Sequence, residues 1–131
     1  MSAYTIKNLK DDVKDAAPDG GLAPGLEAHF AGSSLDCEQS GVSYFRVAPD
    51  FRIPFGHTHG RQEEVYVVVD GTARLNLDGE VHELRKWDAV RMSPEVTRNF
   101  EAGPDGAEFL AFGAPNTGLG DAEMQPGWWT D

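Results

Sequence analysis

Three Asp-Gly pairs, at Asp70-Gly71, Asp78-Gly79 and Asp105-Gly106, divide the second half of the chain into short runs of alternating apolar and polar residues. An Asp-Gly pair between two such runs favours a two-residue hairpin turn, because both residues tolerate a positive φ. We therefore expect a meander of antiparallel strands. The expected strands cover residues 26–30, 38–47, 63–69, 73–77, 81–84, 88–92, 97–101 and 108–112.

Strands at this spacing, with a turn signal between neighbours, predict an all-β sandwich or barrel. A chain of 131 residues is one domain by length and buries about two-thirds of its unfolded surface in one core. Residues 18–25 read as a loop, and residues 113–131 read as an irregular tail. We interpret Trp128 and Trp129 as packing this tail on the outside of the barrel or on a second subunit, with the barrel mouth as the alternative.

The charge of the chain limits its partners. Its 22 acidic and 11 basic residues give a net charge of −11, so we expect neither a nucleic acid nor an anionic membrane as a partner. Cys37 is the only cysteine, so no internal disulfide forms and a reducing, cytoplasmic location is expected. No apolar run follows a basic start, and no apolar segment is long enough to span a membrane, so the sequence predicts neither a signal peptide nor a membrane span.

Two histidines and a glutamate mark the candidate site. His57 and His59 are one residue apart, so on a strand both side chains project from the same face. Glu64 begins the run V-Y-V-V-V, where an unpaired buried charge would be costly and a cation would remove that cost. Two imidazoles and one carboxylate suit a divalent metal such as iron, manganese, nickel or zinc, with open positions for a ligand. The alternative is a pair of solvated surface histidines.

The same residues resemble the first motif of the cupins, G-x5-H-x-H-x3,4-E-x6-G. His57, His59, Glu64 and Gly71 match this motif, and its opening glycine falls on Phe51. The second cupin motif, G-x5-P-x-G-x2-H-x3-N, departs at every fixed position. Those positions are occupied by Trp87, Ser93, Glu95, Arg98 and Ala102.

Arg98 stands where the resemblance implies a third histidine ligand. A guanidinium stays protonated and cannot bind a metal, so Arg98 either swings away from the metal or receives an anion in a metal-free site. A shift in register by one residue would instead turn Asn99 inward as a weak oxygen donor. Tyr66 shares a face with Glu64 and is expected to line the cavity. Arg46 is a candidate for binding a ligand anion, with a surface role as the alternative.

The resemblance implies a single-domain jelly-roll β-barrel of residues 26–112, with an N-terminal arm (1–25) and a C-terminal tail (113–131) packed on the barrel or on a partner subunit. It also implies a homodimer. It leaves the function open between a metal-dependent enzyme of the dioxygenase or isomerase type, a small-molecule binding or sensing protein, and a degenerate barrel used in assembly. The expected ligand is a small anionic or chelating metabolite. We expect no nucleotide cofactor. His29 and His82 are interpreted as surface or interface residues.

Overall fold

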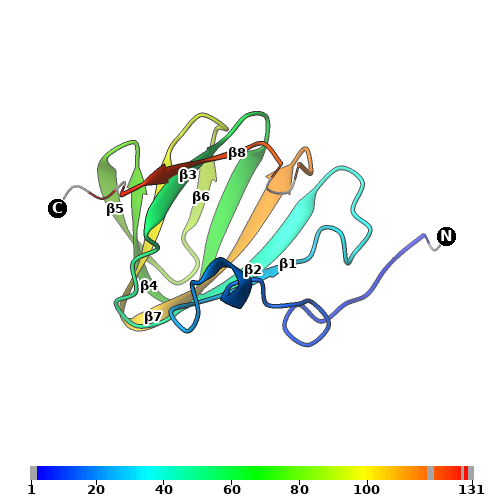
Figure 1. The fold of residues 1–131 in the computed structure, drawn as a ribbon, viewed down its shortest axis with the longest axis horizontal. Helices are drawn as coiled ribbons and strands as arrows, with labels where there is room; N and C mark the ends of the chain where they lie inside the picture. Colours follow the sequence, from blue (N-terminus) through cyan, green and yellow to red (C-terminus); the bar gives the residue numbers. More distant parts are fainter. Residues whose placement is uncertain (1–2, 118–119, 128, 130–131) are drawn as a thin grey trace.

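The computed structural model describes residues 3–117, 120–127 and 129. In these residues one eight-stranded sheet curls into an open barrel, and no helix is long and apolar enough to cross a membrane (Figure 1). The prediction of an all-β barrel is confirmed. The elements are a 3₁₀ helix η1 (Pro18–Gly20) and the strands β1 (Leu26–Phe30), β2 (Gly41–Val47), β3 (Phe55–His59), β4 (Glu63–Leu77), β5 (Glu80–Arg85), β6 (Ala89–Met92), β7 (Arg98–Ala114) and β8 (Ala122–Pro126).

Two long strands organise the barrel. β7 pairs with β2, β3 and β4, and β4 also pairs with β5 and β6, all in the antiparallel sense. The sheet order β1-β2-β7-β3-β8 shows that chain neighbours are not always sheet neighbours. β3 and β8 lie side by side across the mouth of the curl in Figure 1. The strand that carries the two histidines is therefore held between β7 and the C-terminal strand.

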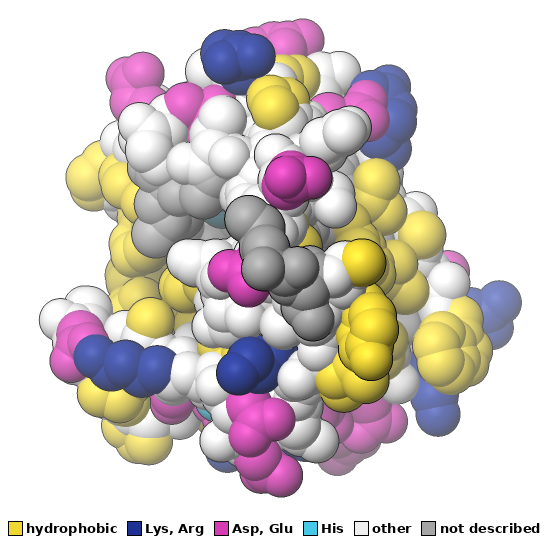
Figure 2. Space-filling view, turned by 90° about the vertical axis from the view of Figure 1, so that its right-hand side faces the viewer, with side chains coloured by type: hydrophobic (Ala, Val, Ile, Leu, Met, Phe, Trp, Pro, Cys, Tyr) yellow, Lys and Arg dark blue, Asp and Glu magenta, His cyan; other side chains and the backbone are white. Residues whose placement is uncertain are grey.

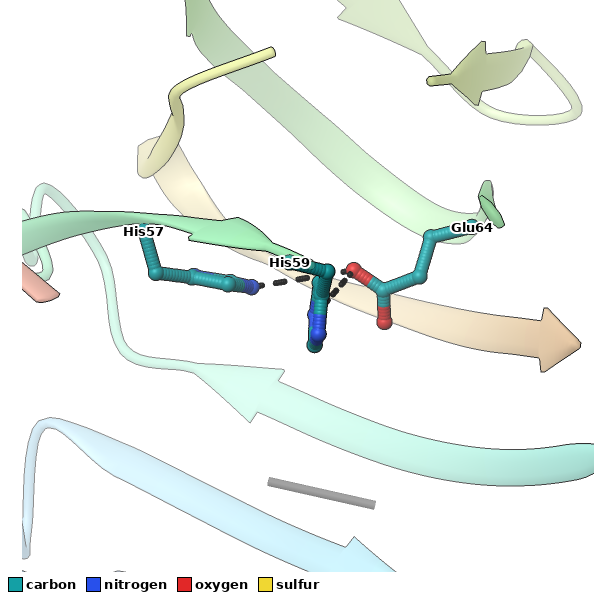
Figure 3. Close-up of side chains that lie close together, drawn as sticks. All are labelled: His57, His59 and Glu64. Carbon is teal, nitrogen blue, oxygen red and sulfur yellow. Dashed lines mark ion pairs between the residues drawn. The ribbon is translucent and has the colours of Figure 1, made fainter. Parts of the chain in front are cut away.

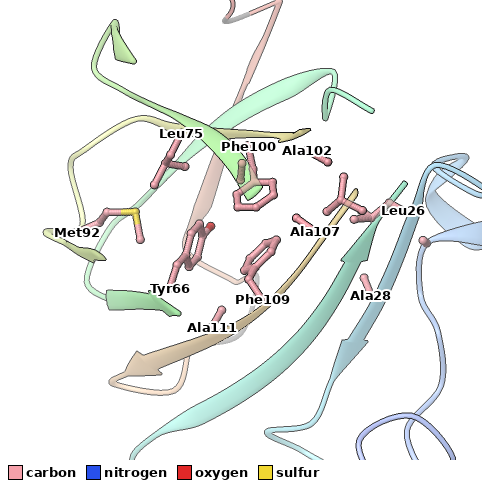
Figure 4. Close-up of a cluster of buried hydrophobic side chains, with 13 residues drawn as sticks. Leu26, Ala28, Tyr66, Leu75, Met92, Phe100, Ala102, Ala107, Phe109 and Ala111 are labelled. Carbon is pink, nitrogen blue, oxygen red and sulfur yellow. The ribbon is translucent and has the colours of Figure 1, made fainter. Parts of the chain in front are cut away.

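The core lies along the inside of the curl. Tyr66 and Leu75 of β4 both turn inward, because the irregularities in register between Val68 and Ala73 shift the alternation of the strand. There they meet Phe100 and Phe109 of β7 (Figure 4). Small residues such as Ala111 leave room between these rings. The opening position of the first motif carries Phe51, whose ring covers Gly25 so closely that a side chain there would overlap it.

The predicted turns at Asp70-Gly71 and at Asp105-Gly106 are wrong. β4 and β7 each continue through these pairs, because the two strands pair with each other on both sides of them. The positive φ of Gly71 is absorbed by irregularities in register between Val68 and Ala73, and Gly106 also has a positive φ. The Asp78-Gly79 turn between β4 and β5 is confirmed.

The tail and the arm are also more ordered than the sequence predicts. The expectation of an irregular tail is wrong where β8 pairs with β3. Trp129 lies against the guanidinium of Arg52, with 4.2 Å between its ring centroid and Cζ, whereas Trp128 lies outside the described residues. In the N-terminal arm, the backbone of Ala16 donates a hydrogen bond to Ala28 of β1.

The expectation that His29 lies at the surface is wrong. Its side chain is buried. The cost of burying the ring is offset because both ring nitrogens have hydrogen-bond partners, the carbonyl oxygen of Val13 at 2.6 Å and the carboxylate of Glu27 at 2.8 Å. Burial alone would lower the pKa of His29, but Glu27, Val13 and Asp15 together raise it. His29 therefore fastens the arm to the outer side of β1.

Candidate metal and ligand site

The two histidines of β3 project together from one face, as their spacing predicts. Their ring centroids are 5.0 Å apart and the rings are nearly perpendicular, at 85°. Figure 3 shows both rings directed towards the carboxylate of Glu64, which comes from the neighbouring strand β4. Almost no histidine is visible on the face of the molecule drawn in Figure 2, where charged and hydrophobic side chains are scattered among other residues.

One oxygen of Glu64 meets both imidazoles. Its Oε1 lies 3.6 Å from Nε2 of His57 and 3.3 Å from Nε2 of His59. Burial alone would raise the pKa of Glu64, but the two imidazoles outweigh burial and lower it to about 2. Glu64 is therefore ionised at neutral pH.

His59 is oriented by a residue that the sequence did not point to. Its Nδ1 donates to Oδ1 of Asp121 at 2.8 Å, just before β8. Asp121 also accepts hydrogen bonds from the backbone N–H groups of Arg61 and Gln62 and from Thr117. Burial works to raise the pKa of Asp121, but these donors and His59 lower it.

Asp121 determines which ring nitrogen of His59 carries a lone pair. With the proton on Nδ1, the Nε2 lone pair of a neutral ring points towards Glu64. This Nε2 is buried and has no hydrogen-bond partner within the described residues. Burial works to lower the pKa of His59, but Glu64 and Asp121 raise it, so the two carboxylates favour a positive charge at this ring.

Arg98 begins β7 and points into the site. Its Nη1 lies 3.3 Å from Oε1 of Glu64, and its Nη2 donates to the carbonyl oxygen of Ser93 at 2.9 Å. The side chain is only 1% exposed, and its Nε has no partner within the described residues. The guanidinium thus occupies the space beside the carboxylate that a third imidazole would fill.

Alternation along β7 places Arg98 on the same face as Phe100 and Asn99 on the other face. The Oδ1 of Asn99 accepts a hydrogen bond from the backbone N–H of Phe100 at 2.8 Å, and Asn99 also contributes to the wall of the cavity. Tyr66 lies inside with Glu64, as expected. Burial first, and then the charge of Glu64, raise its pKa well above the usual value.

Two other residues lie away from this cluster. Arg46 projects outward from β2, where its Nε pairs with Glu27 at 3.2 Å, so it does not line the cavity. His82 lies on β5, where it is half exposed and its Nε2 is 3.3 Å from Glu80, as expected of a surface histidine.

The donor set fits a divalent ion. Two ligands at about 2.1 Å from a tetrahedral ion are roughly 3.4 Å apart, and the Glu64–imidazole distances of 3.6 Å and 3.3 Å match that separation. The three ligand atoms lie within 4.8 Å of one another. The second ring nitrogen of His59 already donates a hydrogen bond to a carboxylate, which is the usual support of a metal-binding histidine. His57, His59 and Glu64 would hold the ion and leave its remaining positions to other molecules.

The cluster forms part of the wall of a cavity of about 690 Å³ inside the barrel. Within the described residues, its wall contains no His, Asp, Glu, Lys or Arg side chain other than those of His57, His59, Glu64 and Arg98. Most of the remaining wall is apolar, and it includes Ala16, Ala17 and Leu22 of the N-terminal arm. The cavity is therefore much larger than a metal site.

Comparison with known families decides the assignment. Residues 43–112, which are more than half of the chain, match the family model described as the cupin domain. The chain belongs to the cupin family. No curated protein matches the sequence of this cupin.

Solved structures share its fold. A cupin protein from Bacteroides fragilis has a TM-score of 0.71 at 24% identity, and the match covers 91% of this chain and 90% of that one. KdgF from Halomonas sp. has a TM-score of 0.69 at 17% identity, with 90% and 97% covered. Oxalate decarboxylase from Bacillus subtilis has a TM-score of 0.74 at 18% identity, and the match covers 92% of this chain but 32% of that one. At these identities the likeness establishes the fold alone.

Proposed function

We propose that this cupin binds a divalent metal ion through His57, His59 and Glu64 and holds a small anionic ligand beside it. One observation carries the proposal: the buried Nε2 of His59 faces Glu64 and has no hydrogen-bond partner within the described residues. A buried polar atom left without a partner costs free energy, and a metal ion between Nε2 and the carboxylate would remove that cost. The contact of Nδ1 with Asp121 orients the lone pair for this purpose.

Arg98 gives the proposed site its preference for anions. The positive charges of a divalent ion and of Arg98 together exceed the negative charges of Glu64 and Asp121, so the loaded site attracts a negative ligand. A guanidinium presents several donors in one plane and matches a carboxylate well. The Nε of Arg98 has no partner in the described part of the chain, so it can donate to a ligand that enters. A bound divalent ion would supply Lewis-acid polarisation of a ligand oxygen.

The proposal is tested by measuring the metal content of protein purified without a polyhistidine tag. We expect close to one equivalent of a divalent metal, and we expect it to be lost in His57→Ala and in His59→Ala. His82→Ala is the matched control, because His82 is a histidine on the outside of the same barrel. Equal metal content in all three variants would overturn the three-ligand site.

A second function is favoured by the position of Arg98. Because the guanidinium is 3.3 Å from Glu64 and almost fully buried, it can serve as the anion anchor of a metal-free binding protein. In that case the tag-free protein contains no metal, and Arg98→Gln abolishes the thermal shift produced by anions. The expected homodimer and the cytoplasmic location stay predictions.

A further inference from the structure

The cavity is built for a ligand with a large apolar body. Its volume of about 690 Å³ lies in the range of sites that enclose drug-sized molecules, far above the need of a metal ion and a few oxygen atoms. The charged side chains are gathered at one cluster, and the wall leads from there to β1 and the arm. Leu26 and Ala28 of β1 face this space across from the aromatic rings (Figure 4).

Aromatic rings form one continuous side of the cavity. Phe109 lies between two nearly parallel rings, with centroid distances of 4.2 Å to Phe100 and 4.7 Å to Phe45. Tyr66 is 4.9 Å from Phe109 and links this side to Glu64. All four residues line the cavity. The faces of Phe109 are covered by its two neighbours, whereas Phe45 ends the stack and is only half-buried. A flat aromatic ligand can extend such a stack at Phe45, because offset stacking adds to the area that is buried.

The polar residues of the wall offer few groups to a sugar-like ligand. Gln62 donates to the carbonyl oxygen of Pro115, and Asn116 donates to that of Cys37. The hydroxyl of Thr117 donates to Asp121. Ser33, Ser43 and Asn99 also line the cavity, and Nδ2 of Asn99 has no partner within the described residues. Most of the wall is nevertheless apolar, so it would replace only some of the bonds to water that a ligand rich in hydroxyl groups loses.

We propose that the ligand is a planar aromatic monocarboxylate, with its carboxylate at the cluster of His57, Glu64 and Arg98 and its ring on the side formed by Phe45 and Phe109. This inference rests on the proposed anion site but adds the class of its ligand. The aromatic body supplies most of the buried area, and the charged cluster fixes which end enters first. Small dicarboxylates and sugars would leave the aromatic side of the cavity uncovered.

The test compares three probes on the full-length protein, by titration calorimetry, with and without added Zn²⁺. 2-Naphthoate has both the ring and the charge, 2-naphthamide has the ring alone, and acetate has the charge alone. We expect 2-naphthoate to bind at least about 10-fold more tightly than either of the others, because it alone uses both parts of the cavity. Equal affinity for 2-naphthoate and acetate would overturn the aromatic class, and equal affinity for 2-naphthoate and 2-naphthamide would overturn the role of the charge.

Phe45→Leu removes one ring from the side of the cavity, and Phe112→Leu, on the outer face of β7, is its control. We expect Phe45→Leu to weaken 2-naphthoate binding by about 3- to 10-fold. The metal content and the acetate affinity of Phe45→Leu should match those of the wild type. The 2-naphthoate affinity of Phe112→Leu should also match that of the wild type. Leu22→Trp, which would fill the cavity from the arm without touching the cluster, is a second variant and should also weaken 2-naphthoate selectively.

The outcomes separate this inference from the proposed function. Retained metal and acetate binding with no preference for 2-naphthoate would overturn the ligand class and leave the site standing. Loss of metal and of all anion binding would overturn both. Equal 2-naphthoate affinity in Phe45→Leu and Phe112→Leu would place the ring elsewhere and overturn the inference.

Discussion

His59 and Asp121 are joined by a 2.8 Å hydrogen bond between segments 62 residues apart in the chain. This contact decides which nitrogen of His59 faces Glu64, and it ties β3 to the segment that leads into β8. The C-terminal part of the chain is therefore a component of the site.

The first prediction concerns Asp121. Asp121→Asn keeps the shape of the side chain but removes the charge that holds the proton on Nδ1, so we expect metal affinity to fall by about 10- to 100-fold. The measurement is the metal dissociation constant by competition with a chelator. Glu123→Gln is the control, since Glu123 is an exposed acidic residue two positions further along. An effect of equal size in both variants would mean that overall charge, rather than the orientation of His59, matters.

The second prediction concerns Arg98. Arg98→His should tighten metal binding, because it removes a positive charge beside Glu64 and offers a fourth ligand. Arg98→Gln separates these two effects, as it removes the charge without adding an imidazole. We expect the order of affinity to be Arg98→His, then Arg98→Gln, then the wild type, with thermal unfolding checked for each. If the histidine variant bound metal no better than the glutamine variant, position 98 would not reach the ion.

The third prediction concerns Gly71 in the first motif. Its φ of 75° and the carbonyl oxygen of Gly106, which a Cβ would overlap, both oppose any side chain. We expect Gly71→Ala to lower the free energy of unfolding by more than about 2 kcal/mol. Gly79→Ala isolates the backbone contribution, because Gly79 has a φ of 93° and open space around it. It should cost only about 1 kcal/mol, and equal costs would show that the overlap with Gly106 relaxes. Chemical denaturation measures both.

The fourth prediction is a pH dependence of stability from His29. The pKa of His29 is raised in the folded protein, so the folded state binds its proton more tightly than the unfolded state does. The stabilisation is fully present below the ordinary pKa of about 6.5 and is lost as the pH rises through the raised value. We therefore expect the melting temperature of the wild type to exceed that of His29→Gln most at pH 5.5, and the difference to shrink towards pH 9. If this difference in melting temperature grew with pH, the folded state would favour the neutral form of His29, and its pKa would be lowered rather than raised. His82→Gln serves as the control.

The clustering of His57, His59 and Glu64 could be predicted because its information is local. The spacing of His57 and His59 fixes a shared face on any strand, and the first motif places Glu64 on the next one. The position of Arg98 also followed from counting along the second motif. Whether Arg98 or Asn99 turns inward could not be predicted, since that depends on how β7 pairs with β4.

The errors arose where distant pairing overrides a local signal. Asp70-Gly71 signals a positive φ, which a hairpin turn and a bulge satisfy equally well, and continuous pairing of β4 with β7 selects the bulge. Asp121 stands in a stretch without alternation, so nothing in the sequence marked it as the partner of His59. His29 reads as a surface residue until Val13 and Glu27 are brought to its two nitrogens.

The contact between Glu64 and Arg98 also joins distant parts of the curled sheet. In the ladder of β4 and β7, Glu64 pairs with Gly113 and Arg98 pairs with Leu77, so the two residues belong to opposite ends of one long ribbon. Their 3.3 Å contact joins those ends across the inside of the curl. An ion or a ligand that draws Glu64 away from Arg98 would break this contact, and one that bridges the two side chains would strengthen it. We therefore expect amide exchange at the two ends of the β4–β7 ribbon to change when the cavity is occupied.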